Sequence, residues 1–331
     1  MMANQIRIIS FVLLFGLSSI AEAQKQVVGA IGFYNVENLF DTMDDPEIND
    51  EEFLPDGAKQ WTPERYQDKL SQLSKVLATM ANGADIIGLS EVENRGVIED
   101  LIKMPQLRGH QYDIVHKDSP DRRGVDVGLI YKKNRFTVLN TTWLEYPEEG
   151  YFTRDILFCT GIYFGDTITI GVNHWPSRRS GPEKRNQAGA LLRQAVDSML
   201  SLSANAKILL MGDFNDDPRN ASIKGELRAA DKEKKMEPGD LFNTSADTYK
   251  LGYGSLSYRG AWNMFDQIII SEGMLQGDGI SYKPNTFSVF GPDWMRQTSG
   301  QYAGSPYRSF SYDNYIGGYS DHFPVYILIE R

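Results

Sequence analysis

The most constraining feature of this sequence is a set of short strand patterns that are apolar on both faces. They lie at residues 207–211, 265–270 and 325–329. A strand with two apolar faces must be covered on both sides, so its sheet lies between other layers. Two amphipathic helix patterns, which begin at Pro63 and Pro182, can supply those layers. The sequence therefore predicts stacked α/β layers.

Polar side chains follow several of these strand patterns at the point where each pattern ends. Asp213 and Asn215 come after the strand at 207–211, and alternation places both on one side, about 7 Å apart by strand rise. Each residue alone has a structural explanation, because Asp, Asn and Ser favour turns and helix caps. Repetition weakens that explanation, since strand ends in layered α/β folds often carry functional groups. The other residues of this kind are Asn35, Glu37 and Glu91.

Two of the four histidines lie in comparable polar settings. His174 follows an asparagine, and His322 follows a serine and an aspartate. Asp266 enters another apolar strand, where it either orients a histidine or caps a turn. His110 and His116 have no such neighbours and are expected to be surface or packing residues.

Composition excludes several kinds of site. The single cysteine, Cys159, rules out an intramolecular disulfide, and with four histidines there is no Cys/His cluster for structural zinc. A net charge of −10 argues against a broad basic surface for nucleic acid, although a local basic patch is compatible with it. The candidates are Arg178 and Arg179, which follow His174, and Arg123, which precedes a strand. Each is either a substrate contact or part of a solvated loop.

The first 23 residues have the pattern of a secretory signal peptide. Arg7 gives a positive start, an apolar run follows at 8–17, and Ala21-Glu22-Ala23 is a small-x-small cleavage signal. No other stretch approaches the ~20 apolar residues of a membrane helix. We expect an exported, periplasmic or extracellular monomer without stable membrane anchoring. Residues 24–331 contain no repeat or low-complexity linker and are expected to form a single domain.

At these residues the chain resembles the endonuclease/exonuclease/phosphatase superfamily, and the match spans nearly all of residues 24–331. The resemblance implies a single catalytic domain with a four-layer α/β sandwich, in which two central, mostly antiparallel sheets are flanked by helices. Each motif is weak alone, but the ordered set is highly specific. The motifs are, in family order, Asn35-Val36-Glu37-Asn38, Ser90-Glu91-Val92-Glu93, Asn173-His174, Gly212-Asp213-Phe214-Asn215, Asp266 and Ser320-Asp321-His322.

The resemblance also implies a metal site. Glu91 matches the central ligand of a divalent cation, with Asn35 nearby and Asp321 either contributing directly or acting through water. Glu37 stands where many relatives have Asp, which leaves one or two metals as alternatives. Carboxylate and amide oxygens without thiolate suit a hard cation, so Mg²⁺ or Mn²⁺ is expected rather than zinc.

The remaining motif residues are implied to handle protons and the phosphate. His322 matches the active-site histidine of the family, with Asp266 as its orienting carboxylate. Asp213 and Asn215 match the pair that positions the attacking water and the phosphate. His174 is similar to a second histidine that contacts the scissile phosphate. Such chemistry suits a phosphodiester, whose anionic oxygens must be neutralised before water can attack in line.

We therefore predict an exported, metal-dependent phosphoesterase, nuclease-like and acting on extracellular nucleic acid. One alternative is a phospholipid-headgroup or phosphoinositide phosphoesterase, and another is a binding module that lost the chemistry. The region at 284–319, rich in Gly, Ser and Tyr, discriminates between the substrates. An exposed apolar tip at Phe290 and Trp294 favours a membrane substrate, whereas a polar, groove-like rim favours nucleic acid.

Overall fold

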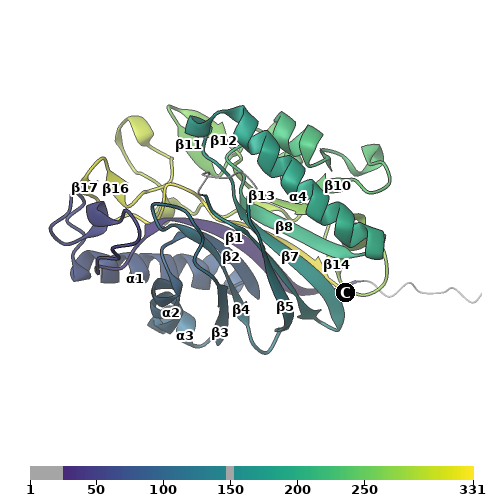
Figure 1. Cartoon of the computed structure of the whole chain (residues 1–331), viewed down its shortest axis with the longest axis horizontal. Helices are drawn as coiled ribbons and strands as arrows, with labels where there is room; N and C mark the ends of the chain where they lie inside the picture. Colours follow the sequence, from purple (N-terminus) through teal and green to yellow (C-terminus); the bar gives the residue numbers. More distant parts are fainter. Residues whose placement is uncertain (1–24, 147–152) are drawn as a thin grey trace, which may run out of the picture.

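The computed structural model describes residues 25–146 and 153–331. Within these residues, two seven-stranded sheets pack against each other and helices cover the outer faces (Figure 1). The predicted four-layer α/β sandwich is confirmed, and most strand pairs in both sheets are antiparallel. The predicted signal peptide, residues 1–23, lies outside the described residues.

The first sheet has the order β14-β18-β1-β2-β4-β3, and β15 also pairs with β18. Strands β1 and β2 are parallel, so their carboxyl ends lie at the same edge. The strands of this sheet are β1 (Val27–Leu39), β2 (Ile86–Val92), β3 (Tyr112–His116), β4 (Asp126–Lys132), β14 (Ser281–Tyr282), β15 (Ser288–Val289) and β18 (Val325–Glu330).

The second sheet has the order β5-β6-β7-β8-β13-β10-β9. Strands β7 and β8 are parallel, which again brings two carboxyl ends to one edge. The strands of this sheet are β5 (Phe136–Leu144), β6 (Ile156–Tyr163), β7 (Asp166–His174), β8 (Lys207–Asp213), β9 (Ala229–Ala230), β10 (Leu241–Asn243) and β13 (Asp266–Ile270).

Two short hairpins lie outside the large sheets. One consists of β11 (Leu256–Tyr258) and β12 (Ala261–Asn263), and the other of β16 (Phe310–Ser311) and β17 (Asn314–Tyr315). In each hairpin the paired strands are joined by a two-residue loop.

Helix α1 (Pro63–Thr79) covers the first sheet and α4 (Pro182–Leu202) covers the second (Figure 1). Both begin with proline at the first helical position, and Thr62 caps α1 by accepting a hydrogen bond from the Arg65 N–H. The other helices are α2 (Arg95–Lys103), α3 (Pro105–Arg108), α5 (Ala246–Lys250) and α6 (Glu272–Leu275), with a π-helical turn at Ser222–Glu226 beside α4.

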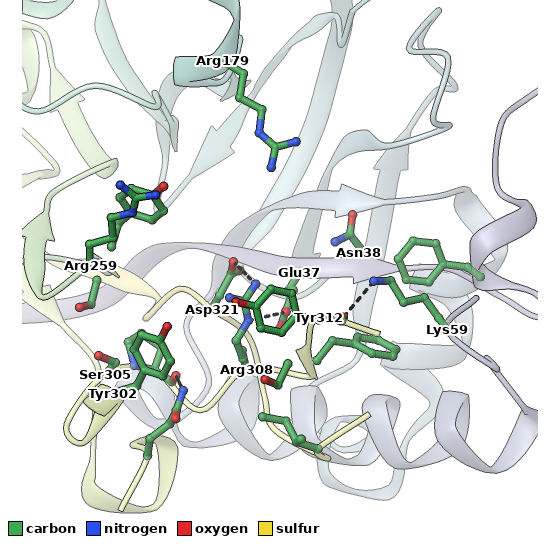
Figure 2. Close-up of a pocket in the computed structure, with 18 residues that line it drawn as sticks. Glu37, Asn38, Lys59, Arg179, Arg259, Tyr302, Ser305, Arg308, Tyr312 and Asp321 are labelled. Carbon is green, nitrogen blue, oxygen red and sulfur yellow. Dashed lines mark hydrogen bonds and ion pairs between the residues drawn. The ribbon is translucent and has the colours of Figure 1, made fainter. Parts of the chain in front are cut away.

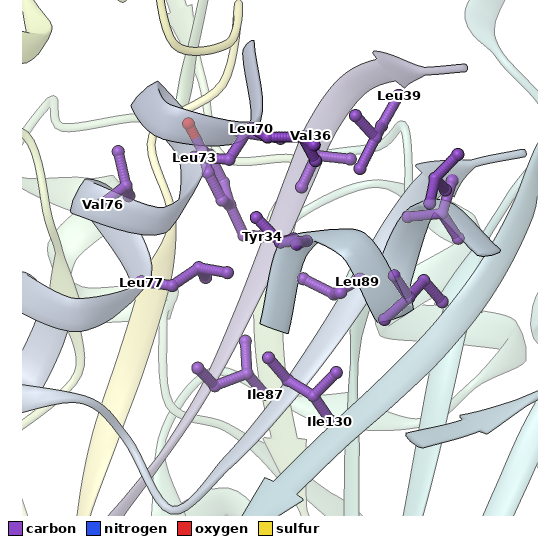
Figure 3. Packing of buried hydrophobic residues seen from close by; sticks show 14 of the residues in the cluster. Tyr34, Val36, Leu39, Leu70, Leu73, Val76, Leu77, Ile87, Leu89 and Ile130 are labelled. Atoms are coloured by element: carbon purple, nitrogen blue, oxygen red, sulfur yellow. The ribbon is translucent and has the colours of Figure 1, made fainter. Parts of the chain in front are cut away.

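Neighbouring residues of one strand serve different core layers. Phe33 of β1 belongs to the apolar cluster between the two sheets, whereas Tyr34 belongs to the cluster between the first sheet and α1 (Figure 3). Leu73 and Leu77 of α1 are fully buried in this second cluster. Each such side chain stabilises the fold by roughly 1.5–3 kcal/mol. The apolar faces predicted for the strands therefore explain the four layers.

Sequence and structure differ mainly at element ends. The apolar sequence pattern at 27–34 predicts the first strand, but β1 continues to Leu39 because Asn35 pairs with Ser90 and Leu39 with Val92 of β2. Helix α2 and strand β3 were not predicted, since both are short and gain their burial from tertiary packing. The density of carboxylates at 41–56 predicts a solvated loop, and most of these residues are exposed, although Phe53 is buried.

Candidate active site

The polar residues found in the sequence meet at one end of the two sheets. Asp213, the last residue of β8, is the direct strand neighbour of both His174 on β7 and Asp266 on β13. Glu91 of β2 comes from the other sheet, and its Oε1 lies 3.8 Å from Nε2 of His174. His322 enters the same cluster from the segment that precedes β18. The two sheets therefore contribute jointly to one site.

His322 and Asp266 form a buried pair. Nδ1 of His322 lies 2.6 Å from Oδ2 of Asp266, and the backbone N–H of His322 donates to Ser320 Oγ at 3.0 Å. The other ring nitrogen, Nε2, lies 3.8 Å from Oδ2 of Asp213. Because Asp266 holds Nδ1, the imidazole presents Nε2 toward Asp213, which is the orientation a proton-transferring histidine needs.

The two histidines of the site have opposite charge preferences. Burial lowers the pKa of His322, but the carboxylates of Asp266 and Asp213 outweigh burial and hold that pKa well above its usual value. Burial also lowers the pKa of His174, and the nearby guanidinium of Arg154 lowers it further, well below its usual value. The site thus combines an imidazole that favours its protonated form with one that favours its neutral form, and a neutral imidazole can both donate and accept a hydrogen bond.

Glu91 lies among hydrogen-bond donors. Its Oε1 accepts from Asn35 Nδ2 at 3.3 Å, and its Oε2 accepts from the Asn38 N–H at 3.0 Å. Nδ2 of Asn35 also donates to Asp213 Oδ2 at 3.1 Å, while its Oδ1 accepts from the Glu37 N–H at 3.0 Å. In this arrangement Asn35 links the two carboxylates through its amide hydrogens, and its oxygen faces the backbone.

Several residues around Glu91 have left-handed backbone conformations. The φ angles are +53° at Glu37, +50° at Asn38, +61° at Glu91 and +52° at Asn215. Such conformations cost non-glycine residues roughly 1–3 kcal/mol each and persist only where the surroundings hold them. Their grouping at the ends of β1, β2 and β8 marks this edge as the place where the backbone is shaped for the site.

Glu37 and Asp321 share a guanidinium. Nε of Arg308 lies 3.5 Å from Oε1 of Glu37, and its Nη2 lies 3.2 Å from Oδ2 of Asp321. The other Glu37 oxygen accepts from the Ser309 N–H at 2.6 Å. Burial and the charge of Asp321 raise the pKa of Glu37, and the cations Lys69 and Arg308 only partly offset that rise.

The sequence reasoning missed Lys69 and Arg308. Lys69 of α1 is fully buried and donates to the Tyr319 carbonyl at 2.8 Å and to the Ser309 hydroxyl. Its spacing was a usable signal, because Lys69 lies four residues before Leu73 on the apolar face of the helix. Arg308 lies in an irregular segment, where no periodicity could reveal its position.

Asn215 is held beside Asp213. Its backbone N–H donates to Asp213 Oδ1 at 2.9 Å, and its Nδ2 donates to the Trp175 carbonyl at 3.0 Å. These bonds fix the side-chain amide at the carboxyl end of β8. The structure therefore places the predicted pair together in the cluster.

The predicted substrate arginines differ in their surroundings. Arg178 donates to Asp217 at 3.0 Å, so it braces the loop that follows β8. Arg179 lines the cavity at the site (Figure 2). Arg123 is half-exposed and lies 3.6 Å from a carboxylate oxygen of Asp121. Among these three, Arg179 has the best access to a ligand.

A cavity of about 570 Å³ opens directly on Glu37 and Asp321. Figure 2 shows Arg259 and Tyr302 at one side of it, Lys59 at the opposite side and Arg179 reaching in from the upper edge. Four cationic residues line a single cavity on a chain with a net charge of −10. They are Lys59, Arg179, Arg259 and Arg308.

The donor set fits a hard divalent cation. Glu37 and Asp321 offer carboxylate oxygens at the cavity, and burial together with the charge of Asp321 raises the pKa of Glu37. Asp213, Asp266 and His322 also lie close enough together to share an ion. Since His322 and Asp266 are already paired, the oxygen set around Glu91 is the better match for Mg²⁺ or Mn²⁺.

The other predicted side chains are structural. Cys159 is buried, and burial raises the pKa of its thiol to about 12. The His110 ring stacks on Tyr112 with centroids 5.6 Å apart. The His116 side chain is buried with Nε2 lying 3.2 Å from Oδ2 of Asp126.

Comparison with known proteins agrees with this geometry. The model of the Endonuclease/Exonuclease/phosphatase family matches residues 30–331. No curated protein sequence matches significantly.

Solved structures with the same fold cover almost the whole chain. TDP2 of D. rerio, complexed with a single-strand DNA product, has a TM-score of 0.57 and 15% identity, over 93% of this chain and 99% of that one. The catalytic domain of human Nocturnin, with a bound sulfate anion, has a TM-score of 0.54 and 16% identity, over 92% of this chain and 97% of that one. The mannosyl-6-phosphatase Bt3783 of Bacteroides thetaiotaomicron VPI-5482 has a TM-score of 0.56 and 17% identity, over 91% of this chain and 99% of that one. At these identities the likeness establishes the fold.

Proposed function

The chain belongs to the Endonuclease/Exonuclease/phosphatase family and is a hydrolase of phosphoric ester bonds, and on that premise we propose that it is an exported, divalent-metal-dependent phosphodiesterase that cleaves nucleic acid. The observation that carries the proposal is the convergence of the His322–Asp266 pair, Asp213 and Glu91 beside a cavity lined by cations.

Each group has a defined task in diester hydrolysis. Glu91, together with Glu37 and Asp321, would hold Mg²⁺ or Mn²⁺, which would supply charge neutralisation for a non-bridging phosphate oxygen. The residues Asp213 and Asn215 orient the attacking water and the phosphate. Asp213 lies next to Nε2 of the imidazole, so both groups can contact one reacting oxygen.

Hydrolysis forms one P–O bond to water and breaks the P–O bond to the leaving alkoxide. Both the attacking and the leaving oxygen carry changing charge, and preorganised donors lower the barrier by stabilising it. His322, protonated and oriented by Asp266, can donate to an oxygen on phosphorus. His174 is buried next to Glu91 and Asp213, and its lowered pKa favours the neutral form, which can donate to the phosphate without adding charge.

The surface around the site favours nucleic acid over lipid. Phe290 and Trp294 pack edge to face with centroids 6.1 Å apart, and Trp294 also packs on Tyr319. Nζ of Lys75 lies 4.2 Å from the Trp294 ring centroid. These rings are partly buried against the core, so they do not form the apolar tip expected for a membrane substrate.

The alternative of a binding module that lost the chemistry has little support, because the central residues are present and hydrogen-bonded to one another.

Export rests on the leader pattern at residues 1–23. Among the described residues, no helix combines the length and apolar character needed to cross a membrane.

The test uses the chain without residues 1–23 and a labelled single-stranded oligonucleotide, with sphingomyelin vesicles as the alternative substrate. We expect cleavage of the oligonucleotide with Mg²⁺ or Mn²⁺, its loss with EDTA, and its recovery when metal is restored. Glu91→Gln should reduce kcat by about 100-fold or more, a loss typical of removing a group that stabilises transition-state charge.

The matched control is Glu99→Gln, which changes an exposed carboxylate paired with Arg95 on α2. It should leave turnover unchanged. Cleavage that persists in EDTA and in Glu91→Gln would reject metal dependence, and preferred hydrolysis of sphingomyelin would reject the nucleic acid substrate.

A further inference from the structure

Exposed tyrosines surround the cavity. In the part of the chain that the structure describes, three tyrosines line it, and they come from strand β11, from the 3-10 turn Gly300–Tyr302 and from the tip between β16 and β17. Tyr258 is 62% exposed, Tyr302 47% and Tyr312 89%. Large aromatic side chains in contact with solvent at a cavity mouth mark a ligand surface.

Two hairpin tips at the cavity present a side chain from a strained position. Tyr312 occupies the two-residue tip between β16 and β17 with φ of +56°, and Arg259 occupies the tip between β11 and β12 with φ of +50°. Hairpin tips of this kind favour Gly, Asn or Asp, because a side chain with a bulky Cβ substituent is disfavoured at positive φ. Retention of strain at a site of ligand access is characteristic of functional loops.

The Tyr312 hairpin is anchored to the body of the protein. Nζ of Lys59 donates to the Tyr312 carbonyl at 3.0 Å and to Asp313 Oδ1 at 2.9 Å. Behind the tip, Tyr315 packs against Trp61 with ring centroids 5.9 Å apart. The backbone of the tip is therefore fixed while the Tyr312 ring stays in solvent, so the ring can receive a ligand at low entropic cost.

Cationic side chains line the same cavity as the tyrosine rings. The guanidinium of Arg259 lies 5.3 Å from the centroid of the Tyr258 ring, next to it in the same hairpin. Arg179 and Arg308 line the same cavity, and Arg308 lies 3.2 Å from Asp321 at the catalytic end. An anionic group is thus attracted by Arg179 and Arg259, and exposed rings lie in the same cavity lining.

We propose that this cavity holds one unpaired nucleotide beside the scissile phosphate, with its base stacked on Tyr312 and its backbone phosphates held by Arg259 and Arg179. This inference rests on the proposed function. Stacking on aromatic side chains requires an open base face, which an end or single strand offers and a continuous duplex does not. A volume of about 570 Å³ lies within the usual range for a pocket that encloses one small ligand.

The experiment compares two single strands of equal length, one of normal sequence and one in which tetrahydrofuran abasic residues replace the nucleotides around the cleavage position. Both carry the same phosphates and differ in the bases. For the unaltered chain with Mg²⁺, we expect kcat/KM to be at least about tenfold higher on the normal strand, and higher on that strand than on its blunt duplex.

Tyr312→Ala should bring the ratio of normal to abasic strand close to one, whereas Tyr312→Phe should preserve it. Tyr253→Ala is the matched control, because Tyr253 is 62% exposed but does not line the cavity. Melting temperatures of all variants establish that each one is folded.

The outcomes separate the two proposals. Cleavage of both strands at equal rates, or a ratio that Tyr312→Ala leaves intact, would reject the nucleotide pocket while leaving the nuclease in place. Failure to cleave either strand, with metal-dependent hydrolysis of mannose 6-phosphate instead, would reject the nucleic acid substrate and the pocket with it. A ratio of normal to abasic strand that falls to about one in Tyr312→Ala but is preserved in Tyr312→Phe would support both the nuclease and the nucleotide pocket.

Discussion

Nδ1 of His322 lies 2.6 Å from Oδ2 of Asp266, although the two residues are 56 positions apart in the chain. Asp266 is fully buried, and its Oδ1 has no hydrogen-bond partner among the described residues. The carboxylate thus directs its one strong interaction to the imidazole. This pairing both orients the ring and keeps it charged.

Replacement of Asp266 by Asn tests that pairing. The amide has the same shape but no charge, so His322 loses the partner that stabilises its protonated form. We expect kcat to fall about 100-fold or more with KM little changed, since general acid–base catalysis contributes 10² to 10⁴ in rate. Steady-state kinetics on an oligonucleotide measure this. An unaltered kcat in a folded Asp266→Asn protein would contradict the role.

Lys69→Met should destabilise the protein by about 3 kcal/mol. The methionine preserves the packing of the stem but removes the ammonium that donates to the Tyr319 carbonyl and to Ser309. A buried acceptor is then left without a donor, and the buried charge of Glu37 loses a compensating cation.

Urea denaturation provides the measurement. Lys75→Met is the control on the same helix, because Lys75 is exposed and packs on Trp294, and its loss should cost less than about 1 kcal/mol. Equal effects of the two substitutions would show that Lys69 has no special role beneath the site.

The lowered pKa of Asp166 predicts that the stability of the fold depends on pH. Burial opposes ionisation, but the Ile280 N–H at 2.7 Å and the Lys207 ammonium at 3.0 Å outweigh it and lower the pKa of Asp166. Because the pKa is lower in the folded state, the ionised carboxylate stabilises the protein at pH values above the unfolded-state pKa of about 4. This contribution is lost as the pH falls through the folded-state pKa.

For Asp166→Asn we therefore expect the free energy of unfolding to drop by about 0.5–1 kcal/mol at pH 7, with a smaller drop as the pH falls below about 4. Denaturation midpoints between pH 3 and 7 measure the difference. Asp278→Asn, an exposed carboxylate on the turn before Ile280, is the control. A difference in unfolding free energy that grew as the pH fell would contradict the stabilising role of the ionised carboxylate.

Tyr312→Asn separates strain from function. Asparagine tolerates the positive φ at this tip better than tyrosine, so stability should be unchanged or rise by up to about 1 kcal/mol. The preference for normal over abasic strands should disappear, because the ring is gone. Thermal unfolding and the cleavage ratio measure the two effects, and a marked fall in melting temperature would show that the ring stabilises the hairpin.

Much of the architecture could be predicted because it depends on local patterns. Strands with two apolar faces and helices with one apolar face require layers wherever they occur, so the residue pattern was sufficient to predict stacked α/β layers, while the number of layers came from the family resemblance. The same holds for Glu91 and Asp213, since each lies at the carboxyl end of a buried strand.

What the sequence determined alone was the fold and the set of polar residues at its strand ends. The tertiary structure decided which loop residues join them: Arg308 between Glu37 and Asp321, Lys69 beneath them, and Tyr312 at the cavity mouth. It also decided that Arg178 braces a loop. Periodicity describes a residue relative to its own strand or helix, whereas the position of an irregular segment depends on contacts hundreds of residues away.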